Sequence, residues 1–437
     1  MSQLPRYESY KDSGVQWLGE IPSHWAVKKL KFLTSYFKGF AFKSEDFSDI
    51  GIPLIKASNV KKFSIENVES HIAFEKVQDA FDRVKLQEGD LILSTVGSLP
   101  NVLNSAVGQI AYVSSDFAGS YLNQNNVCFR SNEKVIPIFL KYFVMSSFFR
   151  RNLDVKALWI ANQAYLEVLD VQNISIIFPD LEEQKIIADF LDKRLAQVDA
   201  LIAKQETLLE KLAEQRVALI SHAVTKGLNP DVEIKESKIS WVKDIPNHWN
   251  VVPVRYLFEF KNNQRIPVSA EDRGKMSEKI YPYYGASGII DFVEDYIFDE
   301  DLLLVAEDGA NLLSRSTPLA FKASGKYWVN NHAHIIKPLD NNLTYWEYVL
   351  ALYDFTPLIS GSAQPKLTKD NLASIKLPNP PDEEKRKICN FLNKPLENLK
   401  EQKLKIEKIL ETLKEYRSTL ITQVVTGKID VRNLKLN

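Results

Sequence analysis

Two stretches of the chain carry residue types that could do chemistry. Residues 379–382, Asn-Pro-Pro-Asp, are similar to the Asn-Pro-Pro-aromatic loop with which amino-methyltransferases hold a flipped base, but Asp382 stands where the stacking ring would be. Residues 179–185, Pro-Asp-Leu-Glu-Glu-Gln-Lys, contain the residue types of a nuclease metal site. Such a site takes its carboxylates from adjacent strands, whereas here they lie within one helical turn. We therefore interpret both stretches as helix starts, with Asp180 and Asp382 as caps and glutamates in the first turn.

Other sequence motifs give no stronger sign of catalysis or metal binding. No Gly-x-x-x-x-Gly-Lys-Ser/Thr motif occurs, and no Gly-rich turn between a strand and a helix is present to hold a cofactor. His332 and His334 lie two residues apart without Cys or carboxylate support, which favours the polar end of a strand over a metal site. His24 and His248 each precede a tryptophan in identical frames, which favours a structural role over proton transfer. The sequence therefore predicts no catalytic residues and no metal site.

The composition is that of a globular protein with several domains. The chain has 437 residues, 45% hydrophobic and 11% aromatic, and this length predicts about two to four domains. Cys128 and Cys389 lie in different halves at no metal-ligand spacing, as expected of thiols in a reducing cytosol. The chain lacks a signal-peptide pattern, and no apolar run reaches the ~18 residues of a membrane span. Basic and acidic residues number 55 and 56, which argues against a strongly basic nucleic-acid binder but not against a local basic face.

A long helical repeat organises each half of the chain. Residues 180–225 contain no proline or glycine, and apolar residues at spacings of three and four predict a long helix with a narrow seam. A matching repeat covers 383–425, so we expect the two helices to pair. Pro395 predicts a break or kink near the start of the second helix and leaves about 397–425 as its dependable part. The predicted helix-pairing residues are Val198, Leu201, Gln205, Leu208, Leu212, Leu219, Leu399, Gln402, Ile406, Ile409, Leu413 and Leu420.

Two of these pairing residues are polar, Gln205 and Gln402. A polar side chain buried in a coiled-coil seam can fix the register at some cost in stability. A glutamine at the edge of the seam that faces water is equally compatible with the pattern.

The start of each half is also duplicated. Residues 17–25, Trp-Leu-Gly-Glu-Ile-Pro-Ser-His-Trp, correspond to residues 241–249, Trp-Val-Lys-Asp-Ile-Pro-Asn-His-Trp, so each half is one module. The middle of each module contains short β-forming runs and then a helix. We expect an α+β fold with two globular mixed α/β domains in tandem, each followed by a long helix, and the two helices paired as an antiparallel coiled coil. The predicted boundaries are 1–16 (N-terminal tail), 17–178 (first domain), 179–228 (first helix), 229–240 (linker), 241–378 (second domain), 379–428 (second helix) and 429–437 (C-terminal tail).

In this order, the motifs resemble the specificity subunit of Type I restriction–modification systems. The resemblance rests on the repeated Ile-Pro-x-His-Trp, the Pro-x-x-Glu-Glu start of each long helix, Tyr-Tyr-Gly-Ala-Ser-Gly at 283–288, and the helix ends at 224–227 and 425–428. It covers essentially the whole chain. It implies that each globular domain is a target-recognition domain that reads one half of a bipartite, asymmetric DNA sequence, and that the paired helices set the spacer between the halves.

The resemblance also implies partners and a division of labour. Two methyltransferase subunits dock on the helices and modify adenine at N6 with S-adenosylmethionine, and two ATP-driven restriction subunits can join them. The specificity subunit performs no chemistry and binds no cofactor, so S-adenosylmethionine, ATP and Mg belong to the partner subunits, and the complex is cytoplasmic. The alternative hypothesis is a coiled-coil interaction scaffold whose globular domains bind protein rather than DNA.

Polar side chains on loops between the predicted strands are the candidates for base reading. Asn and Gln can pair with adenine, and Lys or Arg with guanine or phosphate. Basic and acidic residues nearly balance in both domains, which predicts weak DNA binding without partner subunits. Each candidate alone is more often a turn former or surface group, but clusters at matching places in both domains favour recognition. The candidates are Lys56, Ser58, Asn59, Ser94, Thr95, Ser98, Asn101, Asn123, Gln124 and Asn125 in the first domain, and Tyr283, Tyr284, Ser287, Asn311, Arg315, Asn330 and Lys366 in the second.

Overall fold

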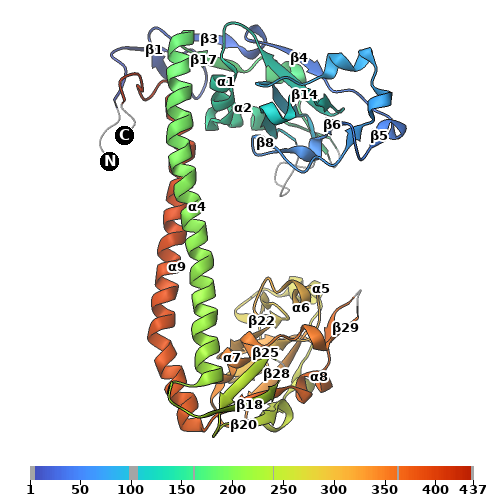
Figure 1. The fold of residues 1–437 in the computed structure, drawn as a ribbon, viewed down its shortest axis with the longest axis vertical. Helices are drawn as coiled ribbons and strands as arrows, with labels where there is room; N and C mark the ends of the chain where they lie inside the picture. Colours follow the sequence, from blue (N-terminus) through green and yellow to red (C-terminus); the bar gives the residue numbers. More distant parts are fainter. Residues whose placement is uncertain (1–4, 98–106, 161–162, 240, 362–363, 435–437) are drawn as a thin grey trace. The chain divides into compact units, whose positions relative to one another are not determined.

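The chain forms two compact units (Figure 1). Unit 1 comprises residues 1–206 and 408–437, and unit 2 comprises residues 207–407. The computed structural model describes residues 5–97, 107–160, 163–239, 241–361 and 364–434. Two long helices, α4 (Leu181–Lys226) and α9 (Asp382–Val425), contribute a segment to each unit.

Unit 1 is built on a four-stranded antiparallel sheet. The strand order is β12 (Ile110–Tyr112), β10 (Leu91–Ser94), β14 (Asn126–Ser131) and β4 (Thr34–Lys38). Side chains alternate along β10, so that Leu91 and Leu93 share one core with the helices α1 (Pro137–Met145) and α2 (Ser147–Lys156). Ile92 points to the opposite face and shares a second core with Leu54. The sheet is therefore buried on both faces.

A second sheet of unit 1 covers that opposite face. Its order is β13 (Tyr121–Leu122), β6 (Ile52–Ile55), β9 (His71–Ile72) and β5 (Phe47–Ser48). The β13 and β6 strands run parallel, and Leu54 and Tyr121 contribute to the second core. Short elements complete the unit: β1 (Tyr10–Asp12), β2 (Glu20–Pro22), β3 (Ala26–Lys29), β7 (Val60–Lys61), β8 (Ser64–Ile65), β11 (Val96–Gly97), β15 (Leu158–Ile160), β16 (Gln163–Tyr165), α3 (Val168–Gln172) and β17 (Ser175–Phe178).

Unit 2 repeats the strand order of the main sheet with different side chains, whereas its second sheet has the parallel pair in the middle and not at the edge. Its main sheet has the order β26 (Ala320–Ala323), β25 (Leu302–Ala306), β28 (Ala333–Pro338) and β21 (Phe258–Phe260), with helix α7 (Leu343–Leu352) on one face. Its second sheet contains β23 (Gly288–Val293), β22 (Tyr281–Gly285), β27 (Lys326–Val329) and β24 (Phe298–Asp299), and β22 and β27 are again parallel. The remaining elements are β18 (Ile234–Ile239), β19 (Val242–Pro246), β20 (Asn250–Pro253), α5 (Ala270–Lys275), α6 (Asn311–Ser314), β29 (Ile359–Ser360), β30 (Lys366–Leu367), α8 (Lys369–Ser374) and β31 (Lys376–Asn379).

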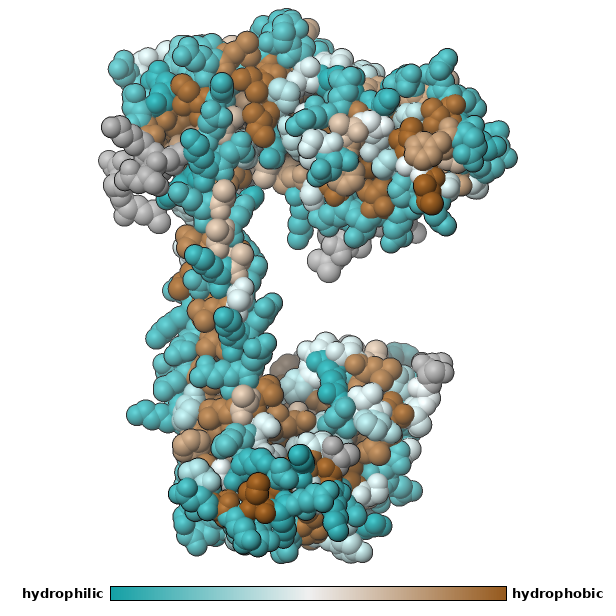
Figure 2. Space-filling view, in the orientation of Figure 1, coloured by the Kyte–Doolittle hydropathy of each residue, from teal (hydrophilic) through white to brown (hydrophobic). Residues whose placement is uncertain are grey.

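Segments of α4 and α9 lie antiparallel, as expected from the sequence. In unit 1, Arg417 donates to Asp199 at 2.7 Å, and Lys414 lies 3.3 Å from Glu206. Residue numbers therefore increase along α4 in the direction in which they decrease along α9. On the face shown in Figure 2, apolar residues are scattered among charged ones along the helices. The predicted α+β class with paired long helices is confirmed.

The predicted seam is partly wrong. Val198, Leu212, Leu399, Ile406 and Leu420 are buried as expected. In contrast, Leu201, Leu208 and Ile409 are 46%, 41% and 45% exposed. Gln402 is also exposed, so this glutamine faces water. The half-buried members are Gln205, Leu219 and Leu413. Leu195 and Leu410, which were not predicted, are buried instead. Apolar residues three or four apart lie in adjacent rows of a helix surface, and the spacing alone does not tell which row faces the partner.

Of the break or kink predicted at Pro395, the break is wrong, because α9 continues from Asp382 to Val425 with Pro395 inside it. A proline removes one backbone donor, which leaves the carbonyl group of Phe391 without its helical hydrogen bond. Phe391 is 50% exposed, so water can reach this part of the helix. Asp382 is the first residue of α9, and its carboxylate contacts Lys385 Nζ at 3.1 Å rather than acting as the predicted cap. Asp180 does cap α4, by accepting from the Glu183 N–H at 2.9 Å.

The duplicated His-Trp pairs hold the first turns of the long helices. In unit 1, His24 Nε2 lies 2.7 Å from Glu183 Oε2, and Trp25 Nε1 donates to Glu183 Oε1 at 3.3 Å. In unit 2, His248 and Trp249 contact Glu384 in the same way, at 2.8 and 3.0 Å. These contacts support the structural role expected for both histidines.

Candidate nucleic-acid interface

The two units place polar residues at the same corner of the fold. In unit 1, the Leu166 N–H donates to the Thr95 carbonyl at 2.9 Å, and the Thr95 N–H donates to the Asn125 carbonyl at 3.0 Å. In unit 2, the Leu367 N–H donates to the Glu307 carbonyl at 2.7 Å, and the Glu307 N–H donates to the His332 carbonyl at 2.9 Å. The same three backbone segments therefore meet where β10 or β25 ends.

We call these places the unit 1 corner (Thr95, Asn125 and Tyr165) and the unit 2 corner (Glu307, His332 and Lys366). By these backbone hydrogen bonds, Thr95 of unit 1 corresponds to Glu307 of unit 2, and Asn125 corresponds to His332. Tyr165 corresponds to Lys366, because each pairs with the residue that follows Thr95 or Glu307. Each corner thus presents side chains from three segments that are distant in sequence. One backbone arrangement carries uncharged side chains in unit 1 and a carboxylate, an imidazole and an ammonium group in unit 2.

An open cavity of about 640 Å³ lies at the unit 1 corner. Its polar lining includes Tyr36, Lys38, Gln124 and Asn125, and Gln124, Asn125 and Lys38 are exposed. Asn126 also lines the cavity, and its buried side-chain oxygen has no hydrogen-bond partner among the described residues. A buried acceptor without a partner is costly unless a ligand or water supplies a donor. The cavity therefore offers both donors and acceptors to a polar ligand.

A larger open cavity, of about 900 Å³, lies at the unit 2 corner. It is lined by Asp308, Leu313, His332, Gln364 and Lys366, among others. His332 is half exposed, and its Nδ1 lies 2.7 Å from Asp308 Oδ1. Lys366 is also half exposed, so an imidazole and an ammonium group are both accessible at this corner.

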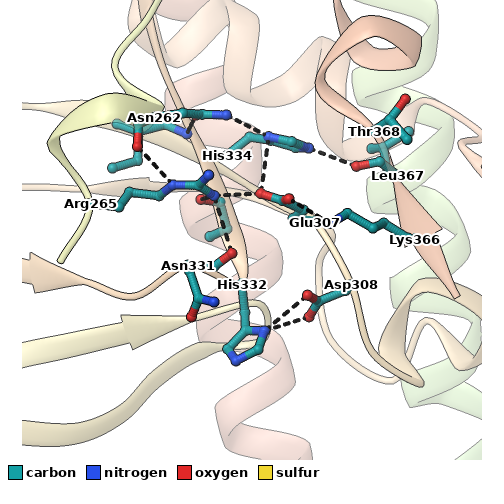
Figure 3. Close-up of polar contacts among 12 residues, drawn as sticks. Asn262, Arg265, Glu307, Asp308, Asn331, His332, His334, Lys366, Leu367 and Thr368 are labelled. Atoms are coloured by element: carbon teal, nitrogen blue, oxygen red, sulfur yellow. Dashed lines mark hydrogen bonds and ion pairs between the residues drawn. The ribbon is translucent and has the colours of Figure 1, made fainter. Parts of the chain in front are cut away.

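A buried polar network supports the unit 2 corner (Figure 3). Glu307 is only 9% exposed, and Arg265 Nη1 donates to its carboxylate, while Lys366 Nζ approaches the other oxygen at 3.3 Å. His334, which is 1% exposed, contacts the Leu367 carbonyl through Nε2 at 2.8 Å and Asn262 Nδ2 through Nδ1 at 2.9 Å. Figure 3 shows that these side chains converge on Glu307 from separate segments of unit 2.

The burial of this network sets the charges within it. Burial raises the pKa of the Glu307 carboxyl, but the hydrogen bond from Arg265 and the other positive charges outweigh it, so the pKa lies below its ordinary value. Burial lowers the pKa of His334, because a charged imidazole is poorly solvated there. At neutral pH, Glu307 is therefore ionised and His334 is neutral.

Several predicted base-reading residues serve the fold of their own loops. Asn59 donates to the carbonyls of Glu66 and Asn67, and Asn311 accepts from the Thr317 N–H at 3.0 Å. Ser94 is fully buried, and Asn330 is 4% exposed. The Tyr283 hydroxyl accepts from the Val268 N–H at 3.0 Å. Side chains with such internal partners are poorly placed to contact DNA.

Other predicted residues remain at the surface. Gln124 and Asn125 line the cavity at the unit 1 corner, and Lys366 lines the cavity at the unit 2 corner. Thr95 also lines the unit 1 cavity but is nearly buried. Lys56 Nζ contacts Ser70 Oγ at 2.7 Å, and Arg315 is paired with Asp354. The other positions are Asn123, which is half-buried, Ser58 and Ser287, which are exposed, and Tyr284, whose ring stacks on Phe321. Ser98 and Asn101 lie outside the described residues.

Of the corner residues, Tyr165, Glu307 and His332 were not among the base-reading candidates, and neither were Lys38, Asp308 and Gln364, which line the cavities beside the corners. A signal for Tyr165 was present, because Gln-Ala-Tyr-Leu at 163–166 matches Gln-Pro-Lys-Leu at 364–367 and so pairs Tyr165 with the predicted Lys366. Within the described ranges, no group of three or more His, Cys, Asp or Glu side chains is placed to hold a metal ion. Every helix among these residues is too short or too polar to cross a membrane.

Comparison with known proteins identifies the class of this repeated architecture. The model of the family described as "Type I restriction modification DNA specificity domain" matches residues 22–211 and 246–411, which is most of the chain. The chain therefore belongs to this family.

Individual relatives agree with this assignment. The chain is 24% identical to a putative type I restriction enzyme specificity subunit, MjaX, of Methanocaldococcus jannaschii over 98% of this chain and 99% of that protein. It is 37% identical to a putative specificity subunit of Haemophilus influenzae over 32% of this chain and 36% of that protein. A solved structure from work on complex assembly and conformational transition of the type I R-M system has a TM-score of 0.68 at 15% identity, over 94% of this chain and 99% of the other. That structural likeness concerns the fold.

Proposed function

We propose that this chain is the DNA specificity subunit of a Type I restriction–modification complex, and that each unit reads one half of a bipartite, asymmetric target. The observation that carries the proposal is the repeated corner. One backbone arrangement occurs in both units, yet Thr95, Asn125 and Tyr165 of unit 1 are replaced by Glu307, His332 and Lys366 in unit 2. Different donors and acceptors on the same frame suit the recognition of two different base sequences.

The paired helices set the spacer between the half-sites and dock two methyltransferase subunits, which two restriction subunits can join. A helix rises ~1.5 Å per residue, so one turn is about 5.4 Å, which corresponds to a base pair or two of duplex DNA. The chain itself is non-catalytic and binds no cofactor. S-adenosylmethionine, ATP and Mg act in the partner subunits, and the complex works in the cytoplasm.

The charge balance of the chain supports a dependence on partners. Lys and Arg number 55 against 56 Asp and Glu, whereas tight DNA binding by one subunit depends on neutralising many phosphates. We therefore assign base reading to this chain and most phosphate contacts to the methyltransferase subunits.

Methylome sequencing of the host with and without this gene tests the proposal. Loss of the gene should remove methylation from one bipartite motif. Exchange of residues 17–178 for those of a relative should change one half of the motif and leave the other half and the spacer unchanged. Deletion of one turn from both long helices should change only the spacer. A methylome that is the same in all these strains would favour a protein-interaction scaffold instead.

A further inference from the structure

Lys366 is the positively charged side chain of the unit 2 corner that can give up its internal contact most easily. Its ammonium group lies 3.3 Å from Glu307 Oε1, and its side chain is 52% exposed. Only the Glu307 side of this pair is buried, at 11% exposure, and water solvates and screens the half-exposed ammonium group, which weakens the pair. Lys366 can therefore leave Glu307 at little cost if the carboxylate keeps another partner.

Arg265 is that other partner, and it is held in place. Its Nη1 donates to Glu307 and to the Ala333 carbonyl at 2.8 Å, and its Nε donates to the Asn262 carbonyl at 3.0 Å. The Arg265 side chain is only 16% exposed. The buried Glu307 carboxylate therefore remains neutralised when Lys366 moves away.

His334 adds no positive charge to this balance. The Asn262 side-chain oxygen accepts from the Ile335 N–H at 2.8 Å, which turns the amide nitrogen of Asn262 toward His334 Nδ1. The imidazole accepts at Nδ1 and donates from Nε2 to the Leu367 carbonyl, so both nitrogens are used by a neutral ring. The remaining acid at this corner, Asp308, is bound to His332 (Figure 3).

We propose that Lys366 is a specificity-determining residue of unit 2, whose ammonium group leaves Glu307 and donates to an acceptor of the target DNA. This inference rests on the proposed function. The acceptor is either a phosphate oxygen or the N7 and O6 atoms of a guanine, since both accept from lysine. The open cavity beside Lys366 gives such an acceptor access to the ammonium group.

The comparison with unit 1 shows that the fold does not require this ion pair. Tyr165 and Thr95 occupy the positions of Lys366 and Glu307, and the same backbone hydrogen bonds form around them. We therefore attribute Lys366 and Glu307 to ligand binding by unit 2 and not to the stability of the fold.

The test uses the complex assembled with its methyltransferase subunits and compares Lys366→Met with the parent chain. DNA binding should weaken roughly tenfold, as expected for one charge-assisted hydrogen bond, and Lys366→Arg should restore most of it. If the acceptor is a phosphate, the methylated motif stays the same and the slope of log affinity against log salt falls by about 1. If it is a guanine, one position of the second half-site becomes degenerate.

Lys369→Met is the matched control. Lys369 lies nearby in α8, but its ammonium group lies over the Phe260 ring at 5.4 Å rather than beside Glu307. It should change neither the motif nor the affinity beyond about twofold, and both variants should melt at the same temperature as the parent chain. An unchanged motif and affinity in Lys366→Met would overturn the inference.

A domain exchange separates this failure from failure of the proposed function. If a relative's residues 241–378 change the second half-site while Lys366→Met changes nothing, the proposed function stands and the inference falls. If the exchange leaves the half-site unchanged, the proposed function itself is wrong.

Discussion

At one corresponding position in the first turn of each long helix, unit 1 buries a neutral side chain and unit 2 buries a charged one. In unit 1 it is Gln184, which is fully buried at the start of α4. Its Oε1 accepts from the Ile136 N–H at 2.8 Å, and its Nε2 donates to the carbonyls of Pro179 and Lys134 at 3.0 and 3.2 Å. A neutral amide thus ties the helix to two neighbouring segments without burying a charge.

In unit 2 the corresponding residue is Lys385, whose side chain is 2% exposed. It is paired with Asp340 and, at 3.1 Å, with Asp382, and it lies 4.8 Å from the centre of the Trp346 ring. A buried charge is expensive unless it keeps its partner. The same backbone position therefore tolerates either chemistry, but unit 2 should be far more sensitive to the loss of one member.

The largest effect should come from Lys385→Met. The change leaves the Asp340 carboxylate, 17% exposed, without its cation, and breaking a buried pair costs about 3–5 kcal/mol. Chemical unfolding of the full chain should show a destabilised transition for unit 2. The double variant Lys385→Met/Asp340→Asn should recover much of this loss, and a single variant as stable as the parent would refute the contrast.

The next largest effect should come from alanine substitutions at the two glycines that follow the corresponding ends of α4 and α9. Gly427, with φ at 71°, would place a Cβ 2.3 Å from Pro22 Cδ, whereas Gly227, with φ at 73°, would place one 2.9 Å from a side-chain carboxylate oxygen of Glu384. Both substitutions by alanine carry backbone strain, but Gly427→Ala also meets a rigid ring. We expect a loss of about 2–4 kcal/mol for Gly427→Ala and about 1–2 kcal/mol for Gly227→Ala, measured by denaturant unfolding. Equal losses would show that Pro22 moves aside.

Gln184→Leu should have a smaller effect than Lys385→Met. It leaves the Ile136 N–H and two carbonyl groups without their partner, at a cost of about 1–3 kcal/mol. Thermal unfolding of both variants under the same conditions gives the ranking. A Gln184→Leu loss as large as that of Lys385→Met would mean that charge is not the source of the difference.

The smallest effect concerns acid sensitivity. Burial raises the pKa of Asp340, but hydrogen bonds from Lys385, the Asn342 N–H and Trp346 more than offset this, so the folded-state pKa lies below the ordinary value of 3.8. A depressed carboxyl pKa stabilises the fold above the ordinary pKa, and this contribution is lost as pH falls through the folded-state value. The parent chain should therefore lose more unfolding free energy than the Lys385→Met/Asp340→Asn variant as pH falls from about 5 through the folded-state pKa of Asp340. Parallel losses in urea titrations would contradict this assignment.

The sequence predicts the large elements because their signals extend over many residues. The duplicated Ile-Pro-x-His-Trp and the two long apolar repeats lead to two modules and a helix pair, which the structure contains. Single positions were less predictable. Pro395 follows a local rule that α9 overrides, because the helix continues through this proline where Phe391, four residues before it, is exposed to water. Leu201 differs from its buried neighbour Val198 only by the row of the helix it occupies.

The corners were harder to predict because they depend on which way a loop side chain points. Asn59 and Asn125 are the same residue type, yet Asn59 bonds to the carbonyls of its own segment while Asn125 lines a cavity. Backbone pairing decides this, through the hydrogen bond between Thr95 and Asn125. Such pairing joins segments far apart in the chain, so composition and spacing carry little information about it.

The division of the chain between the units has a consequence for its synthesis. Unit 2 is one continuous stretch, 207–407, whereas unit 1 needs residues 408–437, which leave the ribosome after all of unit 2. Leu420, Ile421 and Val424 of this late stretch belong to the same core as the sheet and helices of unit 1. During translation, unit 2 can close while that core still exposes apolar surface, so the module made first is the one completed last.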